Sequence, residues 1–343
     1  MKALVTGGGG FLGRHIVTKL LARGDQVRVL GRRPYPDLQK LGVETVQADL
    51  QDAAAVERAC LGMETVFHVA ARAGYWGSWD SYYGPNVVGT RNVLNGCRQA
   101  GLRKLIYTST PSVVSAHGGL EGVDESVPYP ARYTCSYPAT KAIAERLVLE
   151  ANGGGGLLTV SLRPHLIFGP GDPHLFPRII ARARQGQLFQ VGDGTNKVDV
   201  VYVENAADAH LLAADRLRED SPVNGQAYFI SQGVPVLLWA WINEILERMR
   251  LPHVGRKVSY GMARAVGAAM EIAYTVLPLR GEPLMTRFLA DLLATSHYFD
   301  ISKARKDLGY EPRISTEDGL DRTIKALQNG SMIPGVATPG LLQ

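Results

Sequence analysis

The stretch Thr6-Gly7-Gly8-Gly9-Gly10-Phe11-Leu12-Gly13 decides the fold of this 343-residue chain. It follows a run of buried-strand character at residues 2–6 and opens a segment at 11–22 whose apolar residues recur at helical spacing. A glycine pattern alone would carry little weight. A glycine-rich turn between a strand and a helix, however, is the context in which such a loop binds the pyrophosphate of a dinucleotide. The sequence therefore predicts a dinucleotide-binding unit at the start of the chain.

Each part of this loop has a predicted role. Gly7 permits the tight turn, Gly10 lets the backbone approach a pyrophosphate, and Gly13 lets the helix pack closely on the sheet. The start of the helix, at Phe11 and Leu12, presents free N–H groups and a partial positive charge to the phosphates. We expect these five residues to form the phosphate-binding part of a cofactor site.

Strand-like and helical patterns alternate through the first half of the chain. Predicted strands lie at 26–30, 44–47, 65–69, 104–109 and 158–163, and predicted helices lie near 53–61, 87–100 and 137–152. This alternation predicts an α/β fold of the Rossmann type, a doubly wound parallel sheet with both faces covered.

After residue 164 the alternation becomes irregular. The segments 199–203 and 227–230 are expected to return to the sheet as strands, and the chain from Val236 onward is mostly helical in pattern. We therefore divide the chain into three parts: a cofactor-binding core at 1–168 to which 198–231 returns, a smaller, mainly helical C-terminal substrate-binding cap at 169–197 and 232–330, and a tail at 331–343.

Composition restricts the class of protein. The net charge of +5 comes from scattered Lys and Arg, so we expect no nucleic-acid partner. Cys60, Cys97 and Cys135 are odd in number and far apart, which predicts neither disulfides nor a metal site. With no room for a signal peptide before the first strand, a cytoplasmic location is expected. The apolar stretch 260–279 is interrupted by charges, so we expect a buried or cleft-lining helix, with peripheral contact to a membrane as the alternative.

The end of the second predicted strand distinguishes the two nicotinamide cofactors. An acidic residue there would bind the ribose 2′-hydroxyl of NAD(H), but the sequence reads Gly31-Arg32-Arg33. Two guanidinium groups could bind the 2′-phosphate of NADP(H) instead, or could simply solvate a loop. NADP(H) is thus the expected cofactor, with NAD(H) left open. Asp49 and Leu50, after the third strand, could reach the adenine.

A phenol and an ammonium group lie four residues apart in Tyr137-x-x-x-Lys141, and hence on one face of a helix. The lysine charge is expected to lower the pKa of the phenol, which normally titrates near 10. A pair of this kind arises often by chance, but together with the glycine loop it predicts acid–base chemistry at a bound nicotinamide.

The chain resembles the extended short-chain dehydrogenases/reductases over roughly residues 1–320. The matching segments are the glycine loop, Asp49-Leu50, His68-Val69-Ala70-Ala71, Asn86-Val87-Val88-Gly89-Thr90, Tyr107-Thr108-Ser109-Thr110, Tyr137-x-x-x-Lys141, Arg163-Pro164 and Asp199-Val200-Val201-Tyr202-Val203.

The resemblance implies roles for individual residues. Tyr137 would exchange the proton and Lys141 would also bind the nicotinamide ribose. Thr110 would orient the substrate oxygen, with Ser109 as the runner-up or as a buried structural hydroxyl. Further residues are implied to lie beside the cofactor or the nicotinamide, and these are Ala70, Ala71, Pro164 and His165. The family also implies a homodimer through the helices at 87–100 and 137–152, while Asn86 could tether a helix or a water.

Within this family the chain is most similar to the 3β-hydroxysteroid dehydrogenase branch, and there to bacterial reductases of 2-alkyl-3-ketoacids in long-chain olefin biosynthesis. The segments that carry this likeness are 73–82, 108–113, 140–146, 169–172 and 283–288. It implies a lipid-like substrate, with Tyr75, Trp76 and Trp79 of an aromatic loop closing over it. We therefore expect an NADP(H)-dependent reductase or dehydrogenase of a 2-alkyl-3-ketoacid or a sterol-like compound. The alternatives are a nucleotide-sugar epimerase or dehydratase with bound NAD, and a cofactor sensor without turnover.

Overall fold

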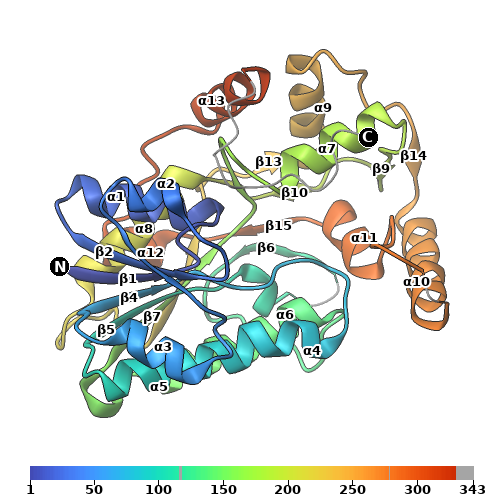
Figure 1. Ribbon diagram of the computed structural model, residues 1–343. Helices are drawn as coiled ribbons and strands as arrows, with labels where there is room; N and C mark the ends of the chain where they lie inside the picture. Colours follow the sequence, from blue (N-terminus) through green and yellow to red (C-terminus); the bar gives the residue numbers. More distant parts are fainter. Residues whose placement is uncertain (116–117, 278, 330–343) are drawn as a thin grey trace.

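A seven-stranded parallel sheet forms the centre of the computed structural model, which describes residues 1–115, 118–277 and 279–329 (Figure 1). The strand order is β12-β7-β5-β4-β1-β2-β3. The strands are β1 (Lys2–Thr6), β2 (Gln26–Gly31), β3 (Glu44–Gln47), β4 (Thr65–His68), β5 (Lys104–Thr108), β7 (Leu158–Pro164) and β12 (Gln226–Ile230). The predicted doubly wound sheet is thus confirmed. Its strand order reverses between β1 and β4, where such sheets bind ligands at the carboxyl edge.

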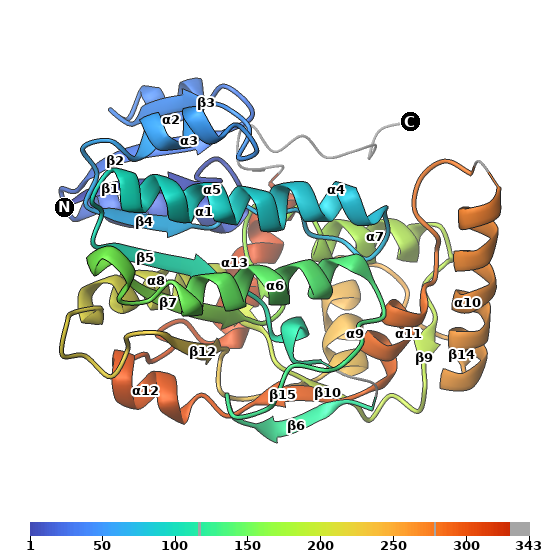
Figure 2. The same ribbon diagram turned by 90° about the horizontal axis from the view of Figure 1, so that it is seen from below.

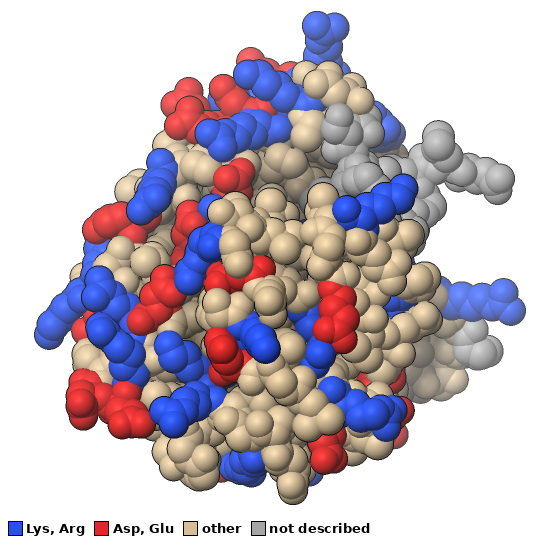
Figure 3. Space-filling view, turned by 60° about the vertical axis from the view of Figure 1, so that its left-hand side comes forward, with Lys and Arg blue, Asp and Glu red and all other residues tan. Residues whose placement is uncertain are grey.

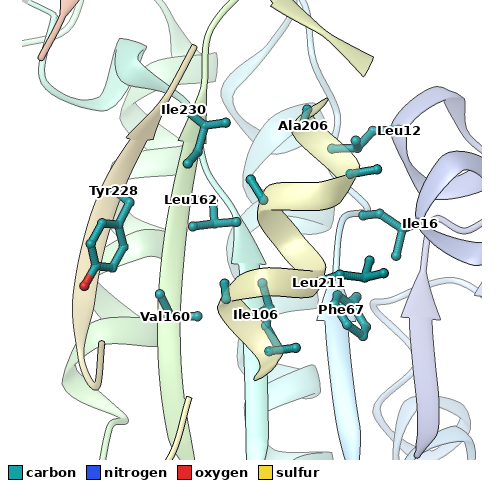
Figure 4. Packing of buried hydrophobic residues seen from close by; sticks show 14 of the residues in the cluster. Leu12, Ile16, Phe67, Ile106, Val160, Leu162, Ala206, Leu211, Tyr228 and Ile230 are labelled. Carbon is teal, nitrogen blue, oxygen red and sulfur yellow. The ribbon is translucent and has the colours of Figure 1, made fainter. Parts of the chain in front are cut away.

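Helices cover both faces of this sheet (Figure 1). One face carries α1 (Phe11–Ala22), α8 (Val203–Arg216) and α12 (Ser302–Leu308), and the other carries α3 (Ala53–Cys60), α5 (Gly89–Gln99) and α6 (Ser136–Glu150). Apolar side chains of α1 and α8 point at the strands, as Figure 4 shows for Leu12, Ile16, Ala206 and Leu211. The predicted dimer through α5 and α6 remains a prediction.

The rest of the chain forms a second body beside the carboxyl edge of the sheet. Its helices are α7 (Leu175–Arg184), α9 (Leu238–Arg248), α10 (Tyr260–Val276), α11 (Arg287–Ala294) and α13 (Thr316–Gln328). Its strands are β9 (Gln190–Val191) paired with β14 (Lys257–Val258), and β10 (Lys197–Val198) between β13 (Val236–Leu237) and β15 (His297–Phe299).

Two elements cross the predicted boundary between core and cap. β6 (Leu120–Val123), expected in the core, pairs with β15. α12, expected in the cap, packs on α8 and β12. The division of the chain into those ranges therefore remains a prediction, while the mainly helical character of the C-terminal part is observed. The predicted tail at 331–343 lies outside the described residues.

The expectation that 199–203 returns to the central sheet is wrong. β11 (Val201–Tyr202) pairs instead with β8 (Ile167–Phe168) in a two-stranded sheet, and α8 begins at Val203. The backbone explains the difference, because Leu166 has a φ of 40°, a conformation that L-residues rarely adopt. This turn diverts the chain from the sheet directly after β7 and offers β8 as a separate partner.

The helix α10 is the most exposed apolar element of the described chain. It lies at one end of the molecule and packs on α11 (Figure 2), while Met262, Ile272 and Val276 are more than half exposed. No helix among residues 1–115, 118–277 and 279–329 is long and apolar enough to cross a membrane. The alternative of peripheral membrane contact through 260–279 remains a prediction. On the face drawn in Figure 3, basic and acidic side chains are interspersed rather than gathered into a basic stripe.

Candidate active site

The glycine loop has the geometry that a dinucleotide requires. Gly7 adopts a left-handed φ of 70°, and a Cβ atom there would lie 2.9 Å from the Cα of Ala70. A Cβ on Gly13 would lie 2.2 Å from the carbonyl oxygen of Gly7, so the helix packs too closely for a side chain. A Cβ on Gly10 would meet only that same oxygen, at 3.2 Å. The loop is therefore tight toward the sheet and open at Gly10, which fits an approaching pyrophosphate.

Hydrogen bonds from His68 fix the ends of β1 and β4 beside this loop. The imidazole bonds to Thr6 at 2.7 Å and to Thr90 at 3.0 Å, and the Thr6 hydroxyl accepts the Ala70 N–H at 3.2 Å. Burial, with a smaller contribution from the Lys141 charge, lowers the pKa of His68 to about 3. His68 is thus a neutral core residue that positions Ala70 through Thr6. No cluster of metal-ligating side chains exists in the described part of the chain.

The other end of the predicted cofactor site is exposed. Arg32 and Arg33 follow β2 at the surface, and the Arg32 carbonyl accepts a hydrogen bond from Gln47 at 3.2 Å. Asp49 and Leu50 lie just beyond β3, at the same edge of the sheet. The residues expected around the adenosine therefore end neighbouring strands, and their contacts with a cofactor remain predictions.

Tyr137 and Lys141 occupy the first turns of α6 at the carboxyl end of β5. Lys141 is 2% exposed and donates a hydrogen bond of 2.6 Å to the carbonyl of Thr108, with its Nζ 4.1 Å from the ring centroid of Tyr107. Burial lowers the pKa of Lys141 to about 7, against the opposing charge of Glu145. The buried ammonium is thus close to its own deprotonation near neutral pH.

The predicted effect of Lys141 on Tyr137 is not observed. Burial raises the pKa of Tyr137 to about 12, and a hydrogen bond with Thr110 only partly opposes it. The lysine is directed to the Thr108 carbonyl and the Tyr107 ring, so its charge does not act on the phenol. Within the polypeptide, Tyr137 is therefore held in its protonated form, as a proton donor requires.

Thr110 and Ser109 lie where the chain leaves β5, and both are buried. The Thr110 hydroxyl caps the following turn by accepting the Ser112 N–H at 3.3 Å, and it also bonds to Tyr137. Ser109 donates its backbone N–H to the Leu162 carbonyl at 2.6 Å. Of the two predicted hydroxyls, Thr110 is the one in contact with the phenol.

Sequence reasoning missed a buried ion pair one helical turn beyond Lys141. The Glu145 carboxylate, fully buried, binds Arg163 at 2.7 Å and accepts hydrogen bonds from Ser161 at 2.7 Å and Tyr129 at 2.6 Å. Burial would raise the pKa of Glu145, but the Arg163 charge and these hydrogen bonds outweigh it and lower that pKa. The available signal was spacing, because Glu145 lies four residues after Lys141 on the same helix face.

The aromatic loop joins the catalytic pair to the C-terminal helices. Tyr75 bonds to Arg178 of α7, and the ring of Trp76 meets that of Tyr274 of α10 with centroids 6.0 Å apart. Tyr82 lies with its ring 6.4 Å from that of Tyr137. This loop therefore bridges the sheet edge and the helices that face it, and its closure over a substrate remains a prediction.

A cavity of about 440 Å³ lies between this loop and α10. Its lining residues are Tyr75, Trp76, Gly77, Tyr82, Thr134, Cys135, Ser136, Ala268, Glu271, Ile272, Thr275 and Arg287. The wall combines aromatic and aliphatic side chains with hydroxyl groups and one ion pair, in which Arg287 donates to Glu271 at 2.7 Å. Burial raises the pKa of the Cys135 thiol to about 12, so this cysteine is no nucleophile.

Two of the predicted substrate residues lie outside that lining. Trp79 stacks on Tyr83, with ring centroids 5.7 Å apart, and is partly exposed. His165 follows Pro164 at the end of β7 and bonds through Nε2 to Nδ1 of His297 at 2.6 Å. Their contact with a substrate remains a prediction.

Asn86 tethers a helix, one of its two predicted roles. Its side chain accepts the Arg72 N–H at 2.7 Å and donates to the Arg72 carbonyl and the Thr140 hydroxyl, both at 3.1 Å. It lies in a π-helical turn, Gly84–Val88, that continues into α5. Asn86 thus fixes the aromatic loop to the helix that carries Tyr137.

Comparison with known proteins agrees with this geometry. The profile of the 3-beta hydroxysteroid dehydrogenase/isomerase family matches residues 4–257. The 2-alkyl-3-oxoalkanoate reductase of Stenotrophomonas maltophilia (strain K279a) is 49% identical over 94% of this chain and 98% of its own. The mouse (Mus musculus) sterol-4-alpha-carboxylate 3-dehydrogenase, decarboxylating, is 34% identical over 96% of this chain and 91% of its own.

A solved structure shares the whole architecture. It is that of MoeE5 in complex with UDP-glucose and NAD, which superposes with a TM-score of 0.74 and 26% identity over 96% of this chain and 99% of its own. The fold and the resemblance on which the sequence predictions relied are thereby confirmed.

Proposed function

Because this chain belongs to the 3-beta hydroxysteroid dehydrogenase/isomerase family, we propose that it is an NADP(H)-dependent oxidoreductase that interconverts a ketone and a secondary alcohol on a bulky apolar substrate. Oxidoreductase activity with a nicotinamide dinucleotide follows from that membership. The preference for NADP(H), the substrate and the role of Tyr137 are the proposal. The observation that carries it is the hydrogen bond between Tyr137 and Thr110, with the ring of Tyr137 6.4 Å from that of Tyr82, which lines the cavity.

In the proposed reaction Tyr137 donates its proton to the carbonyl oxygen, and Thr110 holds that oxygen by a hydrogen bond. Bound NADPH supplies the hydride for the carbonyl carbon. Lys141, one helical turn after Tyr137, would bind the nicotinamide ribose. In the reverse direction Tyr137 accepts the proton.

The cofactor proposal rests on both ends of the site. The loop of Gly7, Gly10 and Gly13 leaves room for a pyrophosphate only on its open side. At the adenosine end, Gly31 offers no carboxylate to repel a 2′-phosphate, and Arg32 and Arg33 supply positive charge. These features favour NADP(H) over NAD(H).

The substrate proposed is a 2-alkyl-3-ketoacid or a sterol-like compound, the classes named for the relatives at 49% and 34% identity. The cavity suits such molecules because Trp76, Tyr82 and Ile272 supply apolar area. The two charged residues of the wall, Arg287 and Glu271, neutralise each other as an ion pair. A nucleotide-sugar epimerase is favoured by no feature of this cavity, and the intact pair Tyr137 and Lys141 argues against a sensor without turnover.

Initial rates with purified protein test the proposal. The expected result is consumption of NADPH, faster than of NADH, with a racemic 2-alkyl-3-ketoacid or a 3-ketosteroid as substrate. UDP-glucose with NAD serves as the comparison for the epimerase alternative. Consumption of reduced cofactor with neither ketone, or turnover of UDP-glucose, would refute the substrate assignment.

A further inference from the structure

Arg14 is a buried cation beneath the glycine loop, and one nitrogen of its guanidinium group has no hydrogen-bond partner among the described residues. It lies in the first turn of α1, is 8% exposed, and donates through Nε to the Gly9 carbonyl at 3.1 Å. Its Nη1 pairs with the carboxylate of Asp37 in α2 (Pro36–Gln39). Its Nη2 is buried, and no residue of the described ranges accepts a hydrogen bond from it. An unpaired charged donor in such a place is costly, so it points to a missing acceptor.

The side chain of Tyr35 lies against Gly9, the residue whose carbonyl Arg14 binds. A Cβ on Gly9 would lie 1.9 Å from Cε1 of Tyr35, and a Cβ on Gly31 would lie 2.3 Å from its hydroxyl oxygen. The phenol therefore extends from the glycine loop to the end of β2. The ring of Tyr35 can occupy this position only because both residues are glycines. It lies between the glycine loop, which Arg14 supports, and the end of β2, which Arg32 follows.

We propose that Arg14 binds the adenosine 2′-phosphate of NADP(H) from below the glycine loop, with Tyr35 moving aside to admit the phosphate. The proposal deepens the proposed function and depends on its preference for NADP(H). A phosphate oxygen would accept the free Nη2–H, while Gly9 and Asp37 keep the other edges of the guanidinium oriented. NAD(H) has only a hydroxyl there, so Arg14 selects between the two cofactors more strongly than an exposed arginine can.

Asp37 acts on the proposed phosphate site in two opposite ways. Its carboxylate holds Arg14 in position, yet it lies close to where a dianion would bind and repels it. Asp37→Asn removes this negative charge and keeps a side chain of the same shape. It should therefore tighten the binding of a 2′-phosphate and leave the binding of an unphosphorylated ribose unchanged.

The test compares binding of 2′,5′-ADP and of 5′-AMP by isothermal titration calorimetry. In Arg14→Met, the affinity for 2′,5′-ADP should fall about tenfold or more, a change of about 1.4 kcal/mol, while that for 5′-AMP changes by less than about twofold. Arg23→Met, at the far end of the same helix, is the matched control and should change neither. Equal losses for both nucleotides in Arg14→Met, or an unchanged affinity for 2′,5′-ADP, would overturn the proposal.

Asp37→Asn keeps the proposal testable if Arg14→Met does not fold. Tighter binding of 2′,5′-ADP with unchanged 5′-AMP supports it, and unchanged or weaker 2′,5′-ADP binding overturns it. The unmodified protein separates this inference from the proposed function. If it does not prefer 2′,5′-ADP to 5′-AMP, the NADP(H) preference fails, whereas a preference that survives in a folded Arg14→Met variant refutes only the role of Arg14.

Discussion

The two ends of the cofactor site hold their charges in opposite ways. At the nicotinamide end Lys141, Glu145 and Arg163 are almost fully buried. Glu145 and Arg163 pair through hydrogen bonds of 2.7–3.2 Å, while Lys141 donates to the Thr108 carbonyl and interacts with Glu145 through its charge alone. At the adenosine end Arg32 and Arg33 are exposed, and only Arg14 beneath the loop is buried.

This difference separates the residues that determine catalysis and stability from those that determine the choice of cofactor. Buried charges have lost their hydration, so their pKa values shift and each depends on its partner. Exposed arginines keep their hydration, so they attract a phosphate without determining the stability of the fold. Substitutions at the nicotinamide end should therefore alter catalysis or stability strongly, and those at the adenosine surface should alter cofactor choice mildly.

The largest effect is expected for Tyr137→Phe, which removes the proton donor but keeps the ring against Tyr82. We expect kcat for reduction of the ketone to fall roughly 10²–10⁴-fold. NADPH affinity, measured by fluorescence titration, should stay within about twofold because the cofactor contacts lie elsewhere. A variant with near-normal kcat would remove Tyr137 from the chemistry.

Glu145→Gln should break the buried network most severely. It leaves Arg163 charged and unpaired, at a cost of about 3–5 kcal/mol in the free energy of unfolding. Denaturant unfolding measures this, and Glu150→Gln, an exposed acid on the same helix, is the matched control and should change little. Equal, small effects in both variants would contradict the idea that the charges at this end depend on one another.

Lys141→Met should abolish activity yet stabilise the fold, because it removes a buried charge. The folded-state pKa of Lys141 is about 7, below the 10.5 of a free lysine. Between pH 7 and pH 10.5 the unfolded chain binds more protons than the folded one, so the free energy of unfolding of the unmodified protein rises with pH in this range. Below about pH 7 Lys141 is charged in both states, and the full cost of burying that charge lowers the stability of the fold.

The gain in Tm from Lys141→Met should therefore be larger at pH 6 than at pH 9. Each kcal/mol corresponds to roughly 2 °C or less for a chain of this length, because the entropy of unfolding grows with the number of residues. Differential scanning calorimetry at both pH values provides the measurement, with the exposed Lys325→Met as control. A gain that is the same at both pH values would show that burial of the charge is not its cause.

The smallest effect is expected for Arg32→Gln at the exposed end. The ratio of kcat/KM for NADPH to that for NADH should fall by several-fold, less than in Arg14→Met, and added salt should weaken the preference of the unmodified protein in the same direction. Steady-state kinetics at two ionic strengths measures both. A larger effect than that of Arg14→Met would reverse the proposed order of the two arginines.

Local sequence signals were sufficient for the sheet and for the residues that lie on it. The strand before the glycine loop, α1 and β3 have the bounds that were predicted. In these segments the residue periodicity, the glycines between strand and helix, and Gly24 after the helix all indicate the same structure. Tyr137 and Lys141 could be placed on one helix face from their spacing alone.

Contacts between distant segments could not be predicted. The pairing of Glu145 with Arg163 joins a helix to a strand, and that of His165 with His297 joins residues 132 positions apart. The path of 199–203 depended on the backbone turn at Leu166, which no propensity indicates. The direction in which the pKa of Tyr137 shifts also depends on its burial and on the orientation of Lys141, and both are properties of the tertiary structure.

Transfer of deuterium tests the central claim most directly. The protein is incubated with a 2-alkyl-3-ketoacid and NADPH deuterated at C4 of the nicotinamide, prepared separately on each face, and the product is analysed by mass spectrometry. The account predicts a hydroxyacid with one deuterium on the carbinol carbon from one of the two faces, and no such product from Tyr137→Phe in the same time. A product without deuterium from either face, or no product at all, would contradict direct hydride transfer to a ketone in this site.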